Sequence, residues 1–227
     1  LLQSQLDACE ADPNIRAIVI TGQGKAFCAG QDLKEVTTPE LHPGFKKILE
    51  EHYNPIITRI RAIEKPMIAA VNGVAAGAGA NIALACDIVV ASEKASFIQA
   101  FSKIGLVPDS AGSFFLPRLI GFQKASALML LGDKVSAAQA QDLGMIYKVF
   151  PPETFHQEVH SLALHMAQLP TKALGLTKKL LNASFNNTLE QQLALESKLQ
   201  IQAANSNDYK EGVSAFVEKR KPNFKGN

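Results

Sequence analysis

A single carboxylate in an uncharged stretch is the first candidate for chemistry. Asp109 lies within Gly105–Ser113 (GLVPDSAGS), and every other residue of that segment is uncharged. Apolar surroundings raise the pKa of a carboxyl group, which suits it to proton transfer near neutral pH. An Asp after Pro is also a common N-cap, here for a helix that begins at Ser110 or Ala111. The physics of the sequence alone leaves both interpretations open.

Two segments of small residues are candidates for backbone hydrogen-bond donors. Cys28-Ala29-Gly30 and Gly73–Ala80 consist almost entirely of residues that let another backbone or a ligand approach closely. Backbone N–H groups at a strand-to-helix turn have no helical partner and lie at the positive end of the helix dipole. Two such turns side by side would form an oxyanion hole. Tight packing of strands on helices is the alternative reading of the same residues.

Signatures of several other chemistries fail. Gly22-Gln23-Gly24 and Gly77-Ala78-Gly79 lack the third small residue of a dinucleotide fingerprint, because Phe27 and Ile82 stand there. The chain has neither a P-loop nor a G-x-S-x-G nucleophile motif. Its histidines and its three cysteines show no metal-ligand spacing, so we expect no metal site.

Composition limits the classes of partner and compartment. The 227 residues are 47% hydrophobic with a net charge of +2, which fits one domain, or one plus an appendage, and disfavours nucleic-acid partners. Widely spaced cysteines favour reduced thiols in a cytoplasmic protein. The longest apolar stretch, Met67–Ala85, is interrupted by Asn and Gly, so we expect no membrane span.

The order of expected elements indicates an α/β fold. Ile15–Thr21, Met67–Val71 and Ile88–Ala91 read as short buried strands, and glycine turns separate them from helical segments. Composition shifts after Pro170, so we divide the chain into a core of residues 1–170 and a helical region of residues 171–227. Three helices are expected in that region: about Thr171–Phe185, Thr188–Ala204 and Asp208–Lys219.

Five segments together resemble the enoyl-CoA hydratase/isomerase (crotonase) superfamily, in order and over nearly the whole chain. They are Ile18–Glu35, Lys65–Phe97, Ser102–Gly121, Ser136–Pro151 and Asn207–Gly226. The resemblance implies a crotonase (ClpP-like) ββα spiral core with a C-terminal helical trimerisation region, and a homotrimer or dimer of trimers. Members of the family usually carry an N-terminal hairpin that is missing here, so we expect Leu1 to be a truncated start rather than the native one.

The resemblance also implies a site for an acyl-CoA thioester. By motif position, the backbone N–H groups of Gln31 and Ala78 would hold the thioester carbonyl as an oxyanion hole. The residues implied to line the CoA channel and the acyl wall are Ala29, Gln31, Asp32, Leu33, Lys34, Phe101 and Phe114. No cofactor is implied beyond the coenzyme A that the substrate carries.

The proton-transfer residues of the family distinguish its members. At the two positions where hydratases carry glutamates, this chain has Asn81 and Phe101, and neither side chain exchanges protons. Asp109 remains, at a position where other members carry a catalytic acid. We therefore expect an isomerase, acting on a ring epoxide or a double bond of thioesters derived from phenylacetyl-CoA. The alternatives are a Δ3,Δ2-enoyl-CoA isomerase or hydratase of fatty-acid β-oxidation, and a non-catalytic scaffold member.

Overall fold

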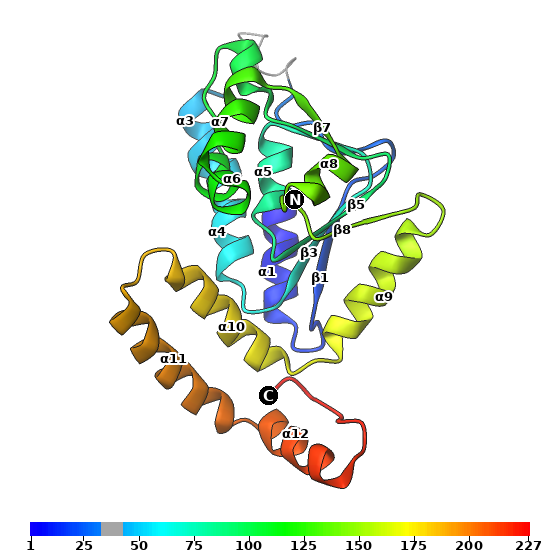
Figure 1. The fold of residues 1–227 in the computed structure, drawn as a ribbon, viewed down its shortest axis with the longest axis vertical. Coiled ribbons are helices and arrows are strands. Elements are labelled where there is room, and N and C mark those ends of the chain that lie inside the picture. The colour runs from blue at the N-terminus through cyan, green and yellow to red at the C-terminus, as the bar shows by residue number, and fades with distance from the viewer. Residues whose placement is uncertain (33–42) are drawn as a thin grey trace.

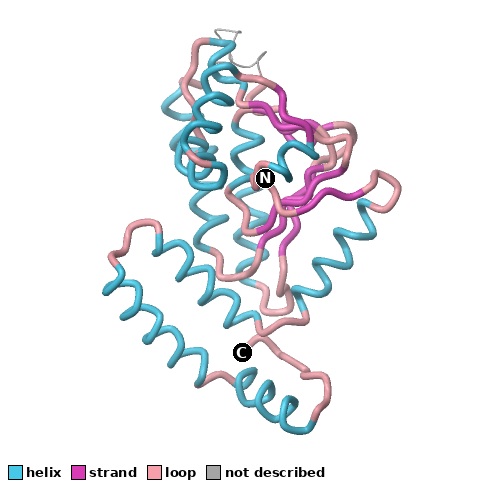
Figure 2. The backbone as a smooth tube through the Cα atoms, viewed as in Figure 1, coloured by secondary structure: helices cyan, strands magenta, loops and turns pink. Residues whose placement is uncertain are grey.

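Eight short strands form two four-stranded sheets in the computed structural model, which describes residues 1–32 and 43–227 (Figures 1 and 2). One sheet has the order β1-β3-β5-β8 and the other the order β2-β4-β6-β7. The strands are β1 (Ile18–Thr21), β2 (Ala26–Cys28), β3 (Met67–Val71), β4 (Val74–Ala76), β5 (Ile88–Ser92), β6 (Ser96–Ile98), β7 (Lys134–Ser136) and β8 (Lys148–Phe150).

From β1 to β6, consecutive strands alternate between the two sheets, which produces a spiral. β1, β3 and β5 pair in parallel in one sheet, and the strand that follows each of them, β2, β4 and β6, pairs in parallel in the other. Only β7 runs antiparallel to its neighbour among the described pairs. Parallel neighbours require crossover connections on the sheet faces, and the helices supply them. The predicted α/β spiral of ββα units is confirmed.

Helices cover the sheets and extend below them. Those of the core are α1 (Leu2–Ala11), α3 (Phe45–Lys47), α4 (Asn54–Ala62), α5 (Ala78–Leu84), α6 (Gly112–Ile120), α7 (Phe122–Leu131), α8 (Ala137–Asp142) and α9 (Phe155–Ala167), with a π-helix at Ile48–Tyr53 and the 3₁₀-helix η2 at Ala100–Ile104. Every residue of β3 and of α5 is buried, so these two elements form the centre of the core.

Three helices form the C-terminal region, within a residue or two of the predicted bounds. They are α10 (Thr171–Ser184), α11 (Leu189–Ala204) and α12 (Asn207–Glu218), and they lie below the sheets in Figure 1. Thr188 and Gln191 form the capping box that begins α11. No helix within the described ranges is long and apolar enough to cross a membrane.

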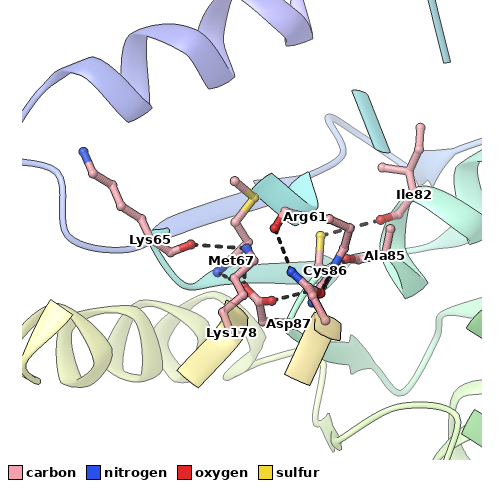
Figure 3. Close-up of polar contacts among 9 residues, drawn as sticks. Arg61, Lys65, Met67, Ile82, Ala85, Cys86, Asp87 and Lys178 are labelled. Carbon is pink, nitrogen blue, oxygen red and sulfur yellow. Dashed lines mark hydrogen bonds and ion pairs between the residues drawn. The ribbon is translucent and has the colours of Figure 1, made fainter. Parts of the chain in front are cut away.

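A largely buried ion-pair cluster joins this helical region to the core (Figure 3). The Asp87 carboxylate, just before β5, accepts hydrogen bonds from Arg61 of α4 at 2.9 Å, Lys178 of α10 at 2.8 Å and the Met67 backbone N–H at 2.9 Å. Arg61 also donates to Asn182 of α10. Burial lowers the pKa of Lys178, and the adjacent Asp87 opposes that shift. We refer to these four side chains, Arg61, Asp87, Lys178 and Asn182, as the Asp87 cluster.

Candidate active site

The two small-residue segments lie against each other, as the sequence predicts. Gly30 has a φ of +90°, and a Cβ built on it would lie 3.2 Å from the Ala76 carbonyl oxygen and 3.8 Å from the Ala78 nitrogen. Helix α5 begins at Ala78, directly after Gly77 with a φ of +54°. The N–H groups of the first turn of a helix have no acceptor within that helix. The turn that carries Gly30 and Gln31 therefore passes beside the donor end of α5.

Glycine is required at the closest of these contacts, at position 79, because no side chain fits there. A Cβ on Gly79 would overlap the backbone of Cys28, the last residue of β2. Above Gly77, the space is filled by the Phe101 ring, whose Cζ atom would lie 3.6 Å from a Cβ built there. Phe101 is itself buried. The Phe101 ring, which is predicted to form part of the acyl wall, therefore lies beside Gly77, one residue before Ala78.

Asp109 lies at the start of the turn that leads into α6, and it is half-buried. Burial raises the pKa of its carboxyl group, and a hydrogen bond from the Ser110 hydroxyl, 2.9 Å from Asp109 Oδ1, partly offsets that rise. The helix begins at Gly112 with Ala111 as its N-cap, and no described side chain caps it. The structure therefore does not support the capping interpretation of Asp109, while the environment expected of a proton-transfer group is present.

The turn after Asp109 has an unusual backbone. Ser110 and Ala111 both adopt left-handed conformations, with φ angles of 48° and 60°. Residues with a Cβ rarely adopt this region, and each one there costs about 1 kcal/mol or more. The Asp109 carbonyl oxygen accepts a backbone hydrogen bond from Gly112 at 2.9 Å, which closes the turn. Strain of this kind persists only where the surroundings hold the turn in place.

Asn81 provides part of that support. The side chain is fully buried in α5, and its Nδ2 donates to the Asp109 carbonyl oxygen at 2.8 Å. Its Oδ1 accepts a hydrogen bond of 2.8 Å from Nε2 of Gln99. Both polar atoms of Asn81 are thus engaged by the protein.

A pocket of about 330 Å³ opens beside the Gln31 turn. Its described lining is largely apolar and includes no Asp or Glu. It consists of Leu2, Cys28, Gln31, Pro43, Ile48, His52, Tyr53, Ile56 and Ile82. The sequence does not predict that the π-helix and α4 line this pocket, because the lining residues come from segments that are distant in the chain.

The predicted ligand-contacting residues are distributed unevenly. Ala29 and Asp32 are exposed beside Gln31, whereas Leu33 and Lys34 lie outside the described residues. Phe114 packs edge-on against Phe185, the residue after α10, with ring centroids 5.4 Å apart. Phe114 therefore lies at the junction with the helical region and lines a different pocket, of about 380 Å³, rather than the one beside Gln31.

Comparison with known proteins identifies the family. The family model for enoyl-CoA hydratase/isomerase matches residues 2–227. The chain belongs to the enoyl-CoA hydratase/isomerase family. This is the crotonase family, whose enzymes act on CoA thioesters.

Relatives of this enoyl-CoA hydratase/isomerase family member are named for different activities. The chain is 47% identical to a 1,2-epoxyphenylacetyl-CoA isomerase from Escherichia coli, covering 99% of this chain and 88% of the relative. It is 39% identical to a mitochondrial enoyl-CoA hydratase from Pongo abelii, covering 99% of this chain and 76% of the relative. A crystal structure of enoyl-CoA hydratase from Bacillus anthracis superimposes with a TM-score of 0.91 at 32% identity, covering 100% of this chain and 87% of that one.

Within the family fold, the motifs single out segments that pack together, but they do not predict the hydrogen bonds between them. Gly30 lies beside Ala76 and Ala78, and the Asp109 carbonyl contacts Asn81 of the helix that begins at Ala78. The motifs mark Asn81 only as the position of a missing carboxylate. They do not predict its hydrogen bond to the Asp109 carbonyl oxygen. A fully buried Asn in an otherwise apolar helix is the signal that could have found it, since buried amides are almost always hydrogen-bonded.

Proposed function

We propose that this chain is an isomerase of CoA thioesters that uses Asp109 as its single proton-transfer group. The observation that carries the proposal is the contrast between the side chains of Asn81 and Asp109. Asn81 has both amide atoms engaged by Gln99 and by the Asp109 carbonyl, so it has no means of activating water. Asp109 keeps a carboxyl group whose pKa is raised by burial. One such group can remove a proton from one carbon and return it to another.

The proposed reaction begins with the thioester carbonyl between the backbone N–H groups of Gln31 and Ala78. For a 3-enoyl thioester, ionised Asp109 takes a proton from C2, and the resulting dienolate places its negative charge on the carbonyl oxygen. Preorganised N–H donors stabilise that oxygen, each worth about 3 kcal/mol in comparable oxyanion holes. Protonated Asp109 then returns the proton to C4, which gives the 2-enoyl product with no change in mass.

An aromatic or ring-epoxide acyl group is the substrate that we favour. The 47% identity to a 1,2-epoxyphenylacetyl-CoA isomerase supports this choice. So does the pocket beside Gln31, whose apolar lining and Tyr53 suit a ring more than a charged group. Aliphatic 3-enoyl thioesters are the second candidate class, and hydratases among the relatives make hydration the third.

A panel of CoA thioesters read by mass spectrometry tests the proposal. Ring-epoxide, 3-enoyl and 2-enoyl thioesters are incubated with the purified protein, and the products are weighed and separated by chromatography. We expect a product of unchanged mass from the ring-epoxide thioester. A gain of one water on a 2-enoyl thioester, without isomerisation of the others, would make the protein a hydratase. Binding without turnover on every thioester would support a scaffold role.

We further propose that the active form is a homotrimer or a dimer of trimers. Apolar side chains of α11 and α12 face solvent in the single chain, among them Leu189, Leu193, Ile201, Phe216 and Val217. Large apolar side chains that remain exposed on two adjacent helices favour contact with further copies of the chain.

A further inference from the structure

The amide of Asn81 connects three segments that are distant in the sequence. It lies in the first turn of α5, receives a hydrogen bond from Gln99 just before η2, and donates one to the carbonyl of Asp109 before α6. Asn81 and Gln99 are both at least nine-tenths buried. We call these two side chains the amide pair.

Hydrogen-bond polarity fixes the direction of both bonds. A backbone carbonyl oxygen only accepts, so the amino group of Asn81 must face Asp109. The oxygen of Asn81 then faces Gln99, which must present its own amino group. The remaining oxygen of Gln99, Oε1, is buried and has no hydrogen-bond partner within the described residues. A buried acceptor left in this state destabilises a fold, so the pair is not arranged for stability alone.

The turn that carries Asp109 rests directly on this pair. A Cβ on Gly112 would overlap the Asn81 amide, so the backbone of the turn touches the side chain without an intervening group. The left-handed residues Ser110 and Ala111 lie between the two contacts. The Asp109 carbonyl at one end and Gly112 at the other thus both depend on Asn81 for their position.

The same helix also carries the predicted oxyanion donor. Ala78 and Asn81 are three residues apart in α5, and the Asn81 N–H closes the first turn of that helix by bonding the Gly77 carbonyl. Residues at this spacing lie on one face of a helix. A rigid helical turn therefore separates the Ala78 N–H from the amide that contacts Asp109.

We propose that Asn81 is a positioning residue, oriented by Gln99, which sets the position of the Asp109 carboxyl group relative to the Ala78 N–H. This inference rests on the proposed function, because it assigns Asp109 the proton-transfer step. The resemblance places Asn81 where hydratases carry a glutamate. In the proposed isomerase, its amide positions the catalytic group.

Gln99→Met separates positioning from stability. Met has nearly the length of Gln and no polar amide, so the variant removes the unpartnered Oε1 together with the donor to Asn81. We expect Tm to stay the same or rise, kcat to fall about tenfold and KM to stay within about twofold, since a misplaced catalytic group lowers the rate without weakening binding. A lower Tm with an unchanged kcat would show a structural role only and overturn the inference.

Asn81→Leu removes the donor to Asp109 itself at nearly constant volume. We expect kcat to fall by about 10- to 100-fold, because displacement of a catalytic group by about 1 Å has effects of that size. Asn187→Leu is the matched control, since it removes an amide that bonds only Gln192 at the α10–α11 loop among the described residues. Its kcat should equal that of the unaltered protein. If Asn81→Leu fails to fold, Gln99→Met still decides the question.

Combination with Asp109→Asn distinguishes this inference from the proposed function. If Asn81 acts through Asp109, Asn81→Leu causes no further loss in the Asp109→Asn background. Turnover by Asp109→Asn at the unaltered rate would overturn the proposed function. An inactive Asp109→Asn together with fully active Gln99→Met and Asn81→Leu proteins would overturn the positioning role alone.

Discussion

Asp109 experiences two opposing influences from its immediate surroundings. Burial raises the pKa of its carboxyl group, while the Ser110 hydroxyl, which donates to Oδ1, lowers it. As a base, Asp109 must be ionised to remove the first proton. Activity should therefore be lost as the pH falls through the pKa of Asp109, and that loss should occur at a higher pH than for an ordinary exposed Asp.

Ser110→Ala tests this balance. Loss of the hydroxyl donor removes the influence that lowers the pKa, so the low-pH limb of kcat/KM against pH should move to higher pH. At a pH where Asp109 is ionised in both proteins, the two rates should agree to within about threefold. The measurement is a pH–rate profile of both proteins on one thioester. A limb that stays in place or moves to lower pH would contradict the assigned role of the hydroxyl.

Elements with long buried runs were predictable, and very short ones were not. Met67–Val71 was predicted to the residue, because five consecutive apolar residues flanked by turns are typical of a buried parallel strand. β4 and β7 have three residues each, too few to show a periodicity, and the sequence analysis missed them. β8 begins only at Lys148, although Met145 and Ile146 before it are apolar and buried, so burial alone does not mark where this strand starts.

The same distinction applies to the site. Glycine spacing predicted where backbones approach, since a required absence of Cβ is visible in the sequence. The hydrogen bonds of the amide pair join residues 81, 99 and 109. The sequences of the separate segments do not specify how these three residues come together. Their positions depend on how α5, η2 and the turn before α6 pack.

The Asp87 cluster holds α10 against α4, and its removal should be costly. Lys178 is 6% exposed, and Asp87→Ala would leave its ammonium group buried without a counter-charge. We expect the free energy of unfolding to fall by about 3–5 kcal/mol, as for other broken buried ion pairs. Asp87→Asn, which keeps an acceptor for Arg61 and the size of the side chain, should lose less. Urea denaturation of the two variants provides the comparison, and an unchanged free energy of unfolding in Asp87→Ala would contradict the importance of the cluster.

The whole molecule has an apolar surface that a single chain does not cover. Phe216 of α12 is 85% exposed, and it borders an open, largely apolar pocket of about 510 Å³ between α10, α11 and α12. The ion pairs of α10 join the helical region to its own core, and this surface is available for the proposed contact between copies.

Phe216→Glu tests the proposed assembly. Light scattering after gel filtration should give a mass of about three or six chains for the unaltered protein. A charge in the centre of a contact between copies is unfavourable, so Phe216→Glu should shift the protein toward single chains. Lys25→Glu, in the exposed turn before β2, is the control and should leave the mass unchanged. A single-chain mass for the unaltered protein at micromolar concentration would contradict the proposal.

The turnover of Asp109→Asn is the most direct test of the central claim. Asn has nearly the same size but cannot exchange protons, so kcat on the isomerised thioester should fall by about 10²- to 10⁴-fold. The dissociation constant of an unreactive CoA thioester should change by no more than about threefold, because Asp109 is assigned to the chemistry rather than to binding. A kcat within a few-fold of the unaltered protein would show that another group transfers the proton and would contradict the account.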